Sequence, residues 1–239
     1  MASEQVYSSN AYMKELETSV HSVVEGGVIL ESTIFYPQGG GQPSDKGKLT
    51  RLSDKKQFTV TDMKKDHGEL IHLVEGEIDL HPGDKVLAEI DWDYRYKLMK
   101  HHTTLHVLSA VVFRNYEAKV TGGTIYENKA RLDFDLQEFN KELAADLVQE
   151  TNEELKKDHQ VSVEFISREE ANKRPELIRT KVNLLPDSIK TLRLVKIGDV
   201  DIQADGGLHV KSTKEIGDIQ LVKVENKGKG RKRITVGVV

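Results

Sequence analysis

Residues 91–114 of the chain read DWDYRYKLMKHHTTLHVLSAVVFR, and the change within them from strand-like to helix-like sequence divides the protein. Apolar residues recur three or four positions apart, which predicts a helix over about 94–114. Asp93 is the expected N-cap, because its carboxylate can accept hydrogen bonds from the first amides of a helix. The apolar positions are Leu98, Leu105, Leu108 and Val112.

On the N-terminal side, residues 20–90 have the pattern of β-structure. Short runs that are β-branched, or that alternate polar with apolar residues, are separated by turn sequences rich in glycine, proline and aspartate. Many short strands between tight turns predict a small barrel or a sandwich. The runs include 28–30, 58–60 and 86–90, and the turns include 26–27, 37–41, 66–68 and 81–84.

On the C-terminal side, helical spacing of leucines predicts a second helix over about 136–158. A short helix is expected within 169–179, interrupted before Pro175. Two domains are therefore expected, residues 1–90 and residues 91–239. Strands are predicted at 191–197, 219–224 and 234–239.

The chain has 239 residues and no cysteine, so it contains neither disulfides nor thiolate metal ligands. No apolar run reaches the roughly 18 residues that a membrane span needs, and the first ten residues lack the pattern of a signal peptide. A soluble, cytoplasmic protein is expected. The formal net charge is −4, so binding of nucleic acid would depend on a local basic patch.

His102 and His106 lie four residues apart in the predicted first helix. Both imidazoles therefore project from one face and can share a metal ion. A zincin would have a glutamate directly after the first histidine, as its general base, but here that residue is Thr103. Taken alone, a histidine pair with this spacing is weak evidence for a metal site.

A second pair of candidate ligands follows in residues 205–209, which read DGGLH. The two adjacent glycines disfavour a helix, so Asp205 and His209 are expected on a tight turn after a strand. An incidental histidine beside an Asp-Gly turn would explain this pair by itself. Together, the two pairs give three imidazoles and one carboxylate, a set that can hold one zinc ion tetrahedrally.

These two pairs resemble the HxxxH and CxxxH motifs of the editing domain shared by alanyl- and threonyl-tRNA synthetases and the AlaX proteins. They occur in the family's order, with Asp205 at the position of the usual cysteine. Residues 33–45 (TIFYPQGGGQPSD) resemble the glycine-rich segment of alanyl-type members, and residues 91–99 are also similar to AlaX. The resemblance covers nearly the whole chain and is strongest to the medium form of the family.

The resemblance implies an α+β fold, with a small N-terminal β-barrel domain followed by an α+β editing domain whose helices pack on an antiparallel sheet. It implies hydrolysis of Ser-tRNA(Ala), and of Gly-tRNA(Ala), at a site that holds one Zn²⁺ ion. A carboxylate holds zinc less tightly than the usual thiolate, so the affinity depends on Asp205. The implied ligands are His102, His106, Asp205 and His209.

Such a site must hydrogen-bond the serine hydroxyl in order to spare alanine, because an apolar pocket discriminates poorly between them. Thr33 and Gln42, on the glycine-rich segment, carry suitable polar groups and are the candidate catalytic residues. An ordinary strand threonine and a tight turn at 39–41 would also account for these residues. No Gly-Lys-Ser/Thr sequence follows the glycines, which argues against a phosphate-binding loop.

A basic segment, residues 223–233, lies between two predicted strands and is expected to form a hairpin tip that contacts tRNA phosphates. Arg95, Lys97 and Lys100, at the start of the first helix, would extend this patch. A solvated charged loop would have the same composition. The candidate tRNA-binding residues are Lys227, Lys229, Arg231, Lys232 and Arg233.

Two other functions fit the same residues. One is a metal-dependent esterase for another acylated RNA or for a small ester, which assays on differently mischarged tRNAs would distinguish. The other is a non-catalytic tRNA-binding module that kept the fold, which the presence of Asp205 in place of cysteine would favour. The sequence does not indicate an oligomeric state.

Overall fold

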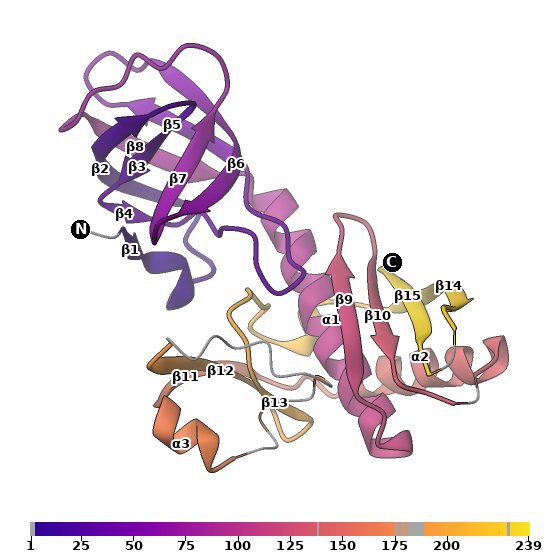
Figure 1. Ribbon diagram of the computed structural model, residues 1–239. Helices are drawn as coiled ribbons and strands as arrows, with labels where there is room; N and C mark the ends of the chain where they lie inside the picture. The colour runs from indigo at the N-terminus through magenta and orange to yellow at the C-terminus, as the bar shows by residue number, and fades with distance from the viewer. Residues whose placement is uncertain (1–2, 138, 175–176, 178–179, 181–188, 229) are drawn as a thin grey trace. The chain divides into compact units, whose positions relative to one another are not determined.

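The computed structural model describes residues 3–137, 139–174, 177, 180, 189–228 and 230–239. Two compact units make up the chain, Met1–Tyr96 and Lys97–Val239. The first contains a β-barrel, and the second contains helices and two sheets (Figure 1). The predicted α+β fold class is therefore confirmed.

The strands of the first unit form a closed antiparallel barrel, which decides between a barrel and a sandwich. Closure pairs every strand edge and turns one face of each strand inward. In order around the barrel the strands are β2 (Glu15–Val24), β3 (Gly27–Leu30), β7 (Glu69–Val74), β6 (Gln57–Asp66), β5 (Gly47–Arg51) and β8 (Lys85–Ile90). The short strands β1 (Glu4–Gln5) and β4 (Ser32–Thr33) form a separate parallel pair. In β6 the inward pattern is visible, since Phe58, Val60 and Met63 are buried and their neighbours are exposed.

A fully buried ion pair joins the start of helix α1 (Trp92–Tyr116) to the glycine-rich segment within the first unit. The side chains of Arg95 and Asp45 are both 0% exposed, and two guanidinium nitrogens contact the carboxylate. Arg95 also donates to the carbonyl oxygens of Ala11 (2.9 Å) and Ile34 (2.5 Å). The expectation that Arg95 extends a surface patch for tRNA is wrong, because its charge is buried against this carboxylate.

Removal of the guanidinium should destabilise the protein strongly. Arg95→Met leaves the Asp45 carboxylate buried without its partner, so a loss of about 3–5 kcal/mol in the free energy of unfolding is expected. The matched control is Lys97→Met, which breaks the half-exposed ion pair with Glu127 and should cost less than about 1 kcal/mol. Urea denaturation followed by circular dichroism measures both. Equal unfolding midpoints for the two variants would contradict this account of the ion pair.

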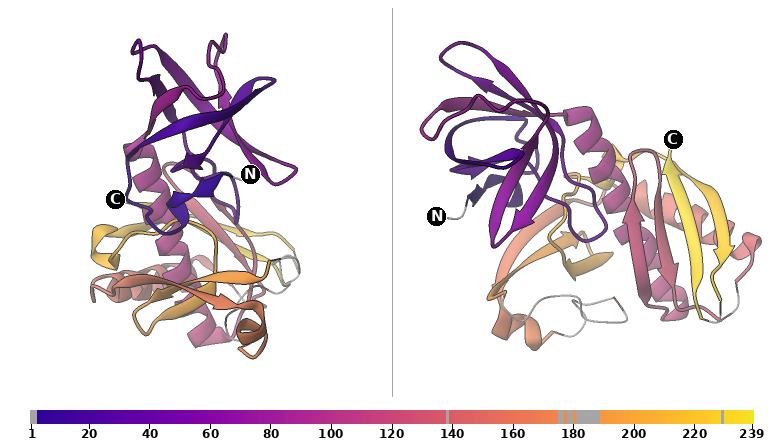
Figure 2. Two further views of the ribbon diagram at one scale, coloured as in Figure 1. Left: turned by 90° about the vertical axis from the view of Figure 1, so that its left-hand side faces the viewer. Right: turned by 45° about the horizontal axis from the view of Figure 1, so that its top comes forward.

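The second unit contains two separate antiparallel sheets (Figure 2). Its elements after α1 are β9 (Val120–Ile125), β10 (Ala130–Phe134), α2 (Lys141–Leu155), β11 (Val161–Ser167), α3 (Arg168–Asn172), β12 (Thr191–Ile197), β13 (Asp201–Ala204), β14 (Ile219–Asn226) and β15 (Lys232–Val238). The larger sheet has the order β14-β15-β10-β9, and the smaller has the order β11-β12-β13. Helix α2 packs beside β14, where the amide side chain of Asn152 pairs with both backbone groups of Ile219 at 2.8 and 2.9 Å.

The two long helices are present, with ends that differ from the sequence prediction. Helix α1 begins earlier, because the Asp91 carboxylate accepts the amide of Tyr94 at 3.0 Å, and the predicted cap Asp93 lies inside the first turn. Helix α2 begins later than predicted, after the N-cap Asn140, whose side chain accepts the amide of Leu143. No helix among the described residues is long and apolar enough to cross a membrane.

The sequence pattern found only some of the second unit's strands. β12 coincides with the predicted strand, and β14 and β15 overlap theirs. The prediction missed β9, β10 and β11, whereas β13 is the strand expected before the turn that carries Asp205. β9 contains two adjacent glycines and β13 has only four residues, so neither has the apolar alternation that marks a strand. A short helix was predicted within 169–179, and α3 (Arg168–Asn172) overlaps the start of that range. Pro175 lies outside the described residues.

Candidate metal centre

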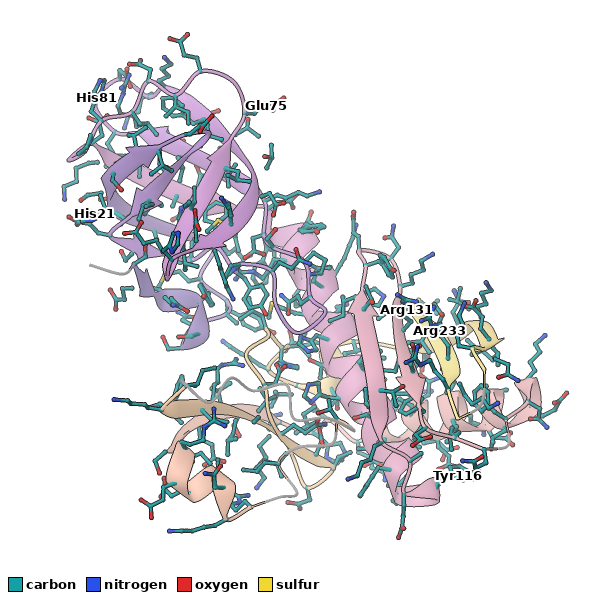
Figure 3. The ribbon with its side chains drawn as sticks, viewed as in Figure 1. His21, Glu75, His81, Tyr116, Arg131 and Arg233 are labelled. Carbon is teal, nitrogen blue, oxygen red and sulfur yellow. The ribbon has the colours of Figure 1, made fainter. Side chains whose placement is uncertain are left out.

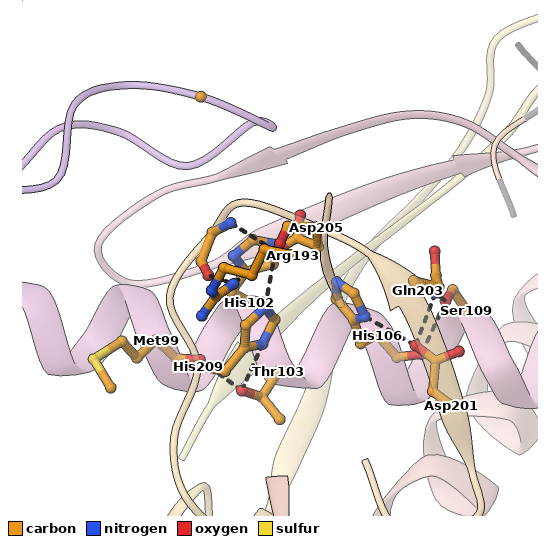
Figure 4. Close-up of polar contacts among 12 residues, drawn as sticks. Met99, His102, Thr103, His106, Ser109, Arg193, Asp201, Gln203, Asp205 and His209 are labelled. Atoms are coloured by element: carbon orange, nitrogen blue, oxygen red, sulfur yellow. Dashed lines mark hydrogen bonds and ion pairs between the residues drawn. The ribbon is translucent and has the colours of Figure 1, made fainter. Parts of the chain in front are cut away.

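Four side chains of the second unit converge from two elements (Figure 4). His102 and His106 project from one face of α1, as their spacing of four residues requires. Asp205 and His209 belong to the loop that follows β13. One ligand-competent atom from each of the four lies within 4.8 Å of the other three. The structure thus brings together the four residues that the sequence singled out as candidate metal ligands.

The geometry and chemistry of the cluster suit a zinc ion. The Asp205 carboxylate lies 3.0 Å from Nε2 of His209 and 3.7 Å from Nε2 of His102. The three histidines are buried, and the Asp205 side chain is 15% exposed. Imidazole and carboxylate ligands lie about 2.0–2.2 Å from a tetrahedral zinc ion, which sets neighbouring ligand atoms about 3–4 Å apart. The observed separations of the carboxylate from the two rings fall within that range.

Burial keeps the imidazoles of His102 and His209 uncharged. It lowers the pKa of His102 to about 4, and it lowers the pKa of His209 well below its usual value. Burial also acts to raise the pKa of Asp205, but the electrostatic effect of His102 and the hydrogen bond with His209 outweigh it, and the pKa lies well below its usual value. At neutral pH His102 and His209 are therefore neutral and Asp205 is ionised, which are the forms that bind metals.

Thr103 orients His209 from the neighbouring position on α1. Its hydroxyl oxygen lies 3.1 Å from the carbonyl oxygen of Met99, 3.2 Å from the amide nitrogen of Val210 and 3.1 Å from Nδ1 of His209. Since a hydroxyl has one proton, donating it to Met99 leaves lone pairs that accept from the amide and from Nδ1–H. Nε2 of His209 faces Asp205, and a metal ion that replaced the proton between these two atoms would find the lone pair on Nε2. From the sequence, Thr103 served only to rule out a zincin.

Asp201 acts in the same way on His106, and the sequence analysis missed it. Its carboxylate lies 2.9 Å from Nδ1 of His106 and accepts from the amide side chain of Gln203 at 2.8 Å. A carboxylate behind an imidazole fixes the ring's orientation and raises its strength as a ligand. A sequence signal existed, because Asp201, Gln203 and Asp205 alternate along β13 and its end, and alternate residues of a strand share one face.

Arg193 on β12 holds the turn that carries Asp205. Its Nη1 donates to the carbonyl oxygens of Asp205 (3.0 Å) and Gly207 (2.7 Å). Gly207 lies so close to His102 that a Cβ at this position would be 2.0 Å from the ring carbon Cε1. A Cβ on the adjacent Gly206 would meet nothing within 4 Å. Only the second glycine of the turn is therefore needed for the close approach to α1.

The chain is similar to known proteins over nearly its whole length. Residues 192–235 match the family described as threonyl and alanyl tRNA synthetase second additional domain, and residues 2–94 match that of class II (A) tRNA synthetases. The chain is 42% identical to the alanyl-tRNA editing protein AlaX-M of Saccharolobus solfataricus and 38% identical to that of Methanosarcina barkeri, with 97% of each chain covered. The chain belongs to the AlaX-M family of alanyl-tRNA editing proteins. It is also 36% identical to AlaX-L of Pyrococcus horikoshii, of which it covers 57%.

In this member of the AlaX-M family, the candidate catalytic residue Thr33 lies in the barrel unit, where its hydroxyl contacts a buried histidine. Thr33 Oγ1 is 2.8 Å from Nε2 of His72 and accepts the amide of Phe35 at 3.0 Å. Burial lowers the pKa of His72 to about 4, so the ring carries a single proton at neutral pH. That proton lies on Nδ1, which is 3.2 Å from the carbonyl oxygen of Val28, so Nε2 accepts the Thr33 proton.

Gln42, the other candidate catalytic residue, follows a tight turn in the same unit. Gly40 and Gly41 have φ angles of 58° and 85°, and the backbone groups of Gly39 and Gln42 pair at 2.9 and 3.1 Å. Two successive positive φ angles in a two-residue connection define a type I′ turn, for which glycine is favoured. The glycine run thus forms a turn rather than a phosphate loop. The catalytic roles of Thr33 and Gln42 remain predictions.

The basic segment connects β14 to β15, and the two cations at its C-terminal end are bound by other groups of the protein. Arg233, labelled in Figure 3, donates two hydrogen bonds of 2.6 and 2.8 Å to the carboxylate of Asp133 on β10. Lys232 is buried, and its Nζ donates to the side chain of Asn226 at 2.9 Å. Both side chains therefore stabilise the base of the hairpin.

Two further candidates for tRNA contact, Lys227 and Arg231, lie toward the tip of the same hairpin. Lys227 and Arg231 are exposed, and Lys227 forms an ion pair with Glu225 at 2.7 Å. Lys229 lies outside the described residues. Contact of this segment with tRNA remains a prediction.

The two glycines of the DGGLH turn give a matched test of the close approach. Gly207→Ala should displace the His102 ring, because the new Cβ cannot fit beside it, and should reduce the amount of zinc bound by the purified protein severalfold or more. Gly206→Ala adds the same methyl group in open space and should keep wild-type zinc content. Metal analysis after equilibration with limiting zinc compares the two. Equal zinc content in both variants would show that Gly207 does not control the position of His102.

Proposed function

We propose that this protein is a trans-editing hydrolase that deacylates Ser-tRNA(Ala) and Gly-tRNA(Ala), with one zinc ion held by His102, His106, Asp205 and His209. The observation that carries the proposal is the convergence of these four side chains within 4.8 Å, in a chain whose relatives are named alanyl-tRNA editing proteins. The proposed substrates place the enzyme in the cytoplasm, where tRNA is charged.

A bound zinc ion would supply a Lewis acid for hydrolysis of the ester between the amino acid and the terminal ribose. The protein prepares the site with its own groups. Thr103 and Asp201 accept the Nδ1 protons of His209 and His106, so both rings present a lone pair to the cluster. Asp205 would bind zinc more weakly than a thiolate does, so it is the ligand that water or substrate would displace.

Thr33 and Gln42 are proposed to select serine over alanine. Because His72 accepts the Thr33 proton, the Thr33 oxygen offers a lone pair and acts as an acceptor for the serine hydroxyl. The Gln42 side chain carries both donors and an acceptor. Alanine cannot make such a hydrogen bond, so a site built around one rejects alanine more strongly than an apolar pocket does.

The tip of the β14–β15 hairpin is proposed to contact tRNA phosphates. Lys227 and Arg231 would supply charge at the tip, and Lys229 is proposed to contact tRNA as well. Lys232 and Arg233, engaged with Asn226 and Asp133, would contribute mainly by holding the hairpin in shape. This arrangement confines the positive charge to a local patch, as the net charge of −4 requires.

Deacylation under matched conditions tests the proposed activity. The protein should release serine from Ser-tRNA(Ala) and glycine from Gly-tRNA(Ala), and should leave Ala-tRNA(Ala) largely charged. His102→Ala should lose bound zinc and most of the activity, because it removes a ligand from the cluster. Thr33→Val should keep zinc and lose discrimination between serine and alanine.

Other outcomes of this experiment favour the alternatives. Full activity and zinc content in His102→Ala would overturn the zinc site. Hydrolysis of other esters with none of mischarged tRNA(Ala) would indicate a different esterase. A metal-free, inactive preparation that still binds tRNA would support a non-catalytic module.

The contribution of Asp205 is testable through the rate of zinc loss to a chelator at one pH. Asp205→Cys should slow the loss, since a thiolate is the stronger zinc ligand. Asp205→Ala should speed it modestly, and less than His209→Ala does. If Asp205→Ala and His209→Ala lose zinc equally fast, Asp205 is a full fourth ligand, and water or substrate does not readily displace it. If neither Asp205 variant changes the rate, Asp205 does not bind the metal.

A further inference from the structure

The three-stranded sheet aligns an exposed aromatic residue with the four candidate metal ligands. Its antiparallel register places Phe165 of β11 directly opposite Arg193 of β12. On the other side of β12, the amide of Asp205 donates to the carbonyl oxygen of Arg193 at 3.0 Å, which continues the pairing of Leu194 with Ala204. Residues directly opposite one another in a sheet lie on the same face. Phe165, Arg193 and Asp205 therefore form one row across the three strands.

The face that carries this row is the face turned toward α1. Asp201 shares that face with Asp205 through the alternation of β13, and Asp201 contacts His106 of α1. The guanidinium of Arg193, in the middle of the row, reaches the carbonyl oxygens of Asp205 and Gly207. The row thus runs from the outer edge of the sheet directly into the cluster.

Phe165 is exposed over 53% of its surface, and Val163, on the same face of β11, over 39%. Edge strands of soluble proteins usually carry charged or otherwise protected positions, so adjacent exposed apolar residues on such a strand indicate a binding surface. Neighbouring strands are about 4.8 Å apart, so the backbones of Phe165 and Asp205 are about 10 Å apart. The ring can therefore contact one end of a ligand whose other end occupies the cluster.

We propose that Phe165 stacks on the nucleobase of the 3′-terminal nucleotide while the aminoacyl ester of that nucleotide lies at the four candidate metal ligands. This proposal rests on the proposed function. The base and the ester are attached to the same ribose, so the distance between them suits the distance between Phe165 and Asp205 along the row. Single-stranded RNA ends are commonly bound by stacking of bases on aromatic side chains. Arg193 adds a positive charge between the two ends of the row, which complements the RNA backbone.

Two small inhibitors of Ser-tRNA(Ala) hydrolysis separate recognition of the base from recognition of the amino acid. One is 3′-serylamino-3′-deoxyadenosine, in which an amide replaces the ester, and the other is serinamide, which lacks the nucleoside. Phe165→Ala should weaken inhibition by the nucleoside probe roughly 5- to 150-fold, as expected for loss of one stacked base, and should not alter inhibition by serinamide. Phe165→Trp should retain inhibition by both probes.

With the tRNA substrate, Phe165→Ala should raise KM and leave kcat and zinc content close to wild type. Val222→Ala, which removes a 50% exposed apolar side chain from β14 in the other sheet, is the matched control and should change neither parameter. Equal inhibition of wild type and Phe165→Ala by the nucleoside probe would overturn the stacking proposal while leaving the editing activity intact. A wild-type protein that hydrolyses no mischarged tRNA would instead overturn the proposed function, and the stacking role with it.

Discussion

The close approach of the DGGLH turn to α1 is the contact on which the candidate metal centre depends. Helix α1 supplies two imidazoles on one face, but it cannot complete a set of four ligands. The turn supplies the other two, and it reaches the helix because Gly207 has no side chain to collide with His102. Arg193 then holds the turn through two backbone carbonyl oxygens. A local backbone requirement at one glycine thus decides whether four distant donors meet.

Around this contact, the protein fixes not only where the candidate ligands lie but also which nitrogen of His106 and of His209 can bind a metal ion. Thr103 and Asp201 engage Nδ1 of His209 and His106. Burial keeps His102 and His209 neutral, so their lone pairs are available at physiological pH. The small sheet connects this arrangement to the surface, because β13 carries Asp201 and the row through Arg193 ends at the exposed edge of β11.

Much of the fold was predictable from local patterns. The first helix has apolar residues at helical spacing, and the barrel strands lie between clear turn signals, so both were recognised. The sequence did not decide between a barrel and a sandwich. That choice depends on whether β2 and β8, which are far apart in sequence, pair with each other. Strands β9 and β13 lack a strong pattern of apolar alternation. Strand β11 was missed, and it lies at the edge of its sheet, where Phe165 is exposed.

The sequence by itself determined the types of donor and the shared face of His102 and His106, since helical geometry acts within a few residues. It could not determine that Arg95 is buried against Asp45 rather than displayed to tRNA, because the partner lies 50 positions away along the chain. The alternation of Asp201 with Asp205 placed both on one face of a strand, but only folding sets the Asp201 carboxylate beside an imidazole. Charge and hydrogen-bonding roles depend on neighbours in space, and only the tertiary structure supplies those neighbours.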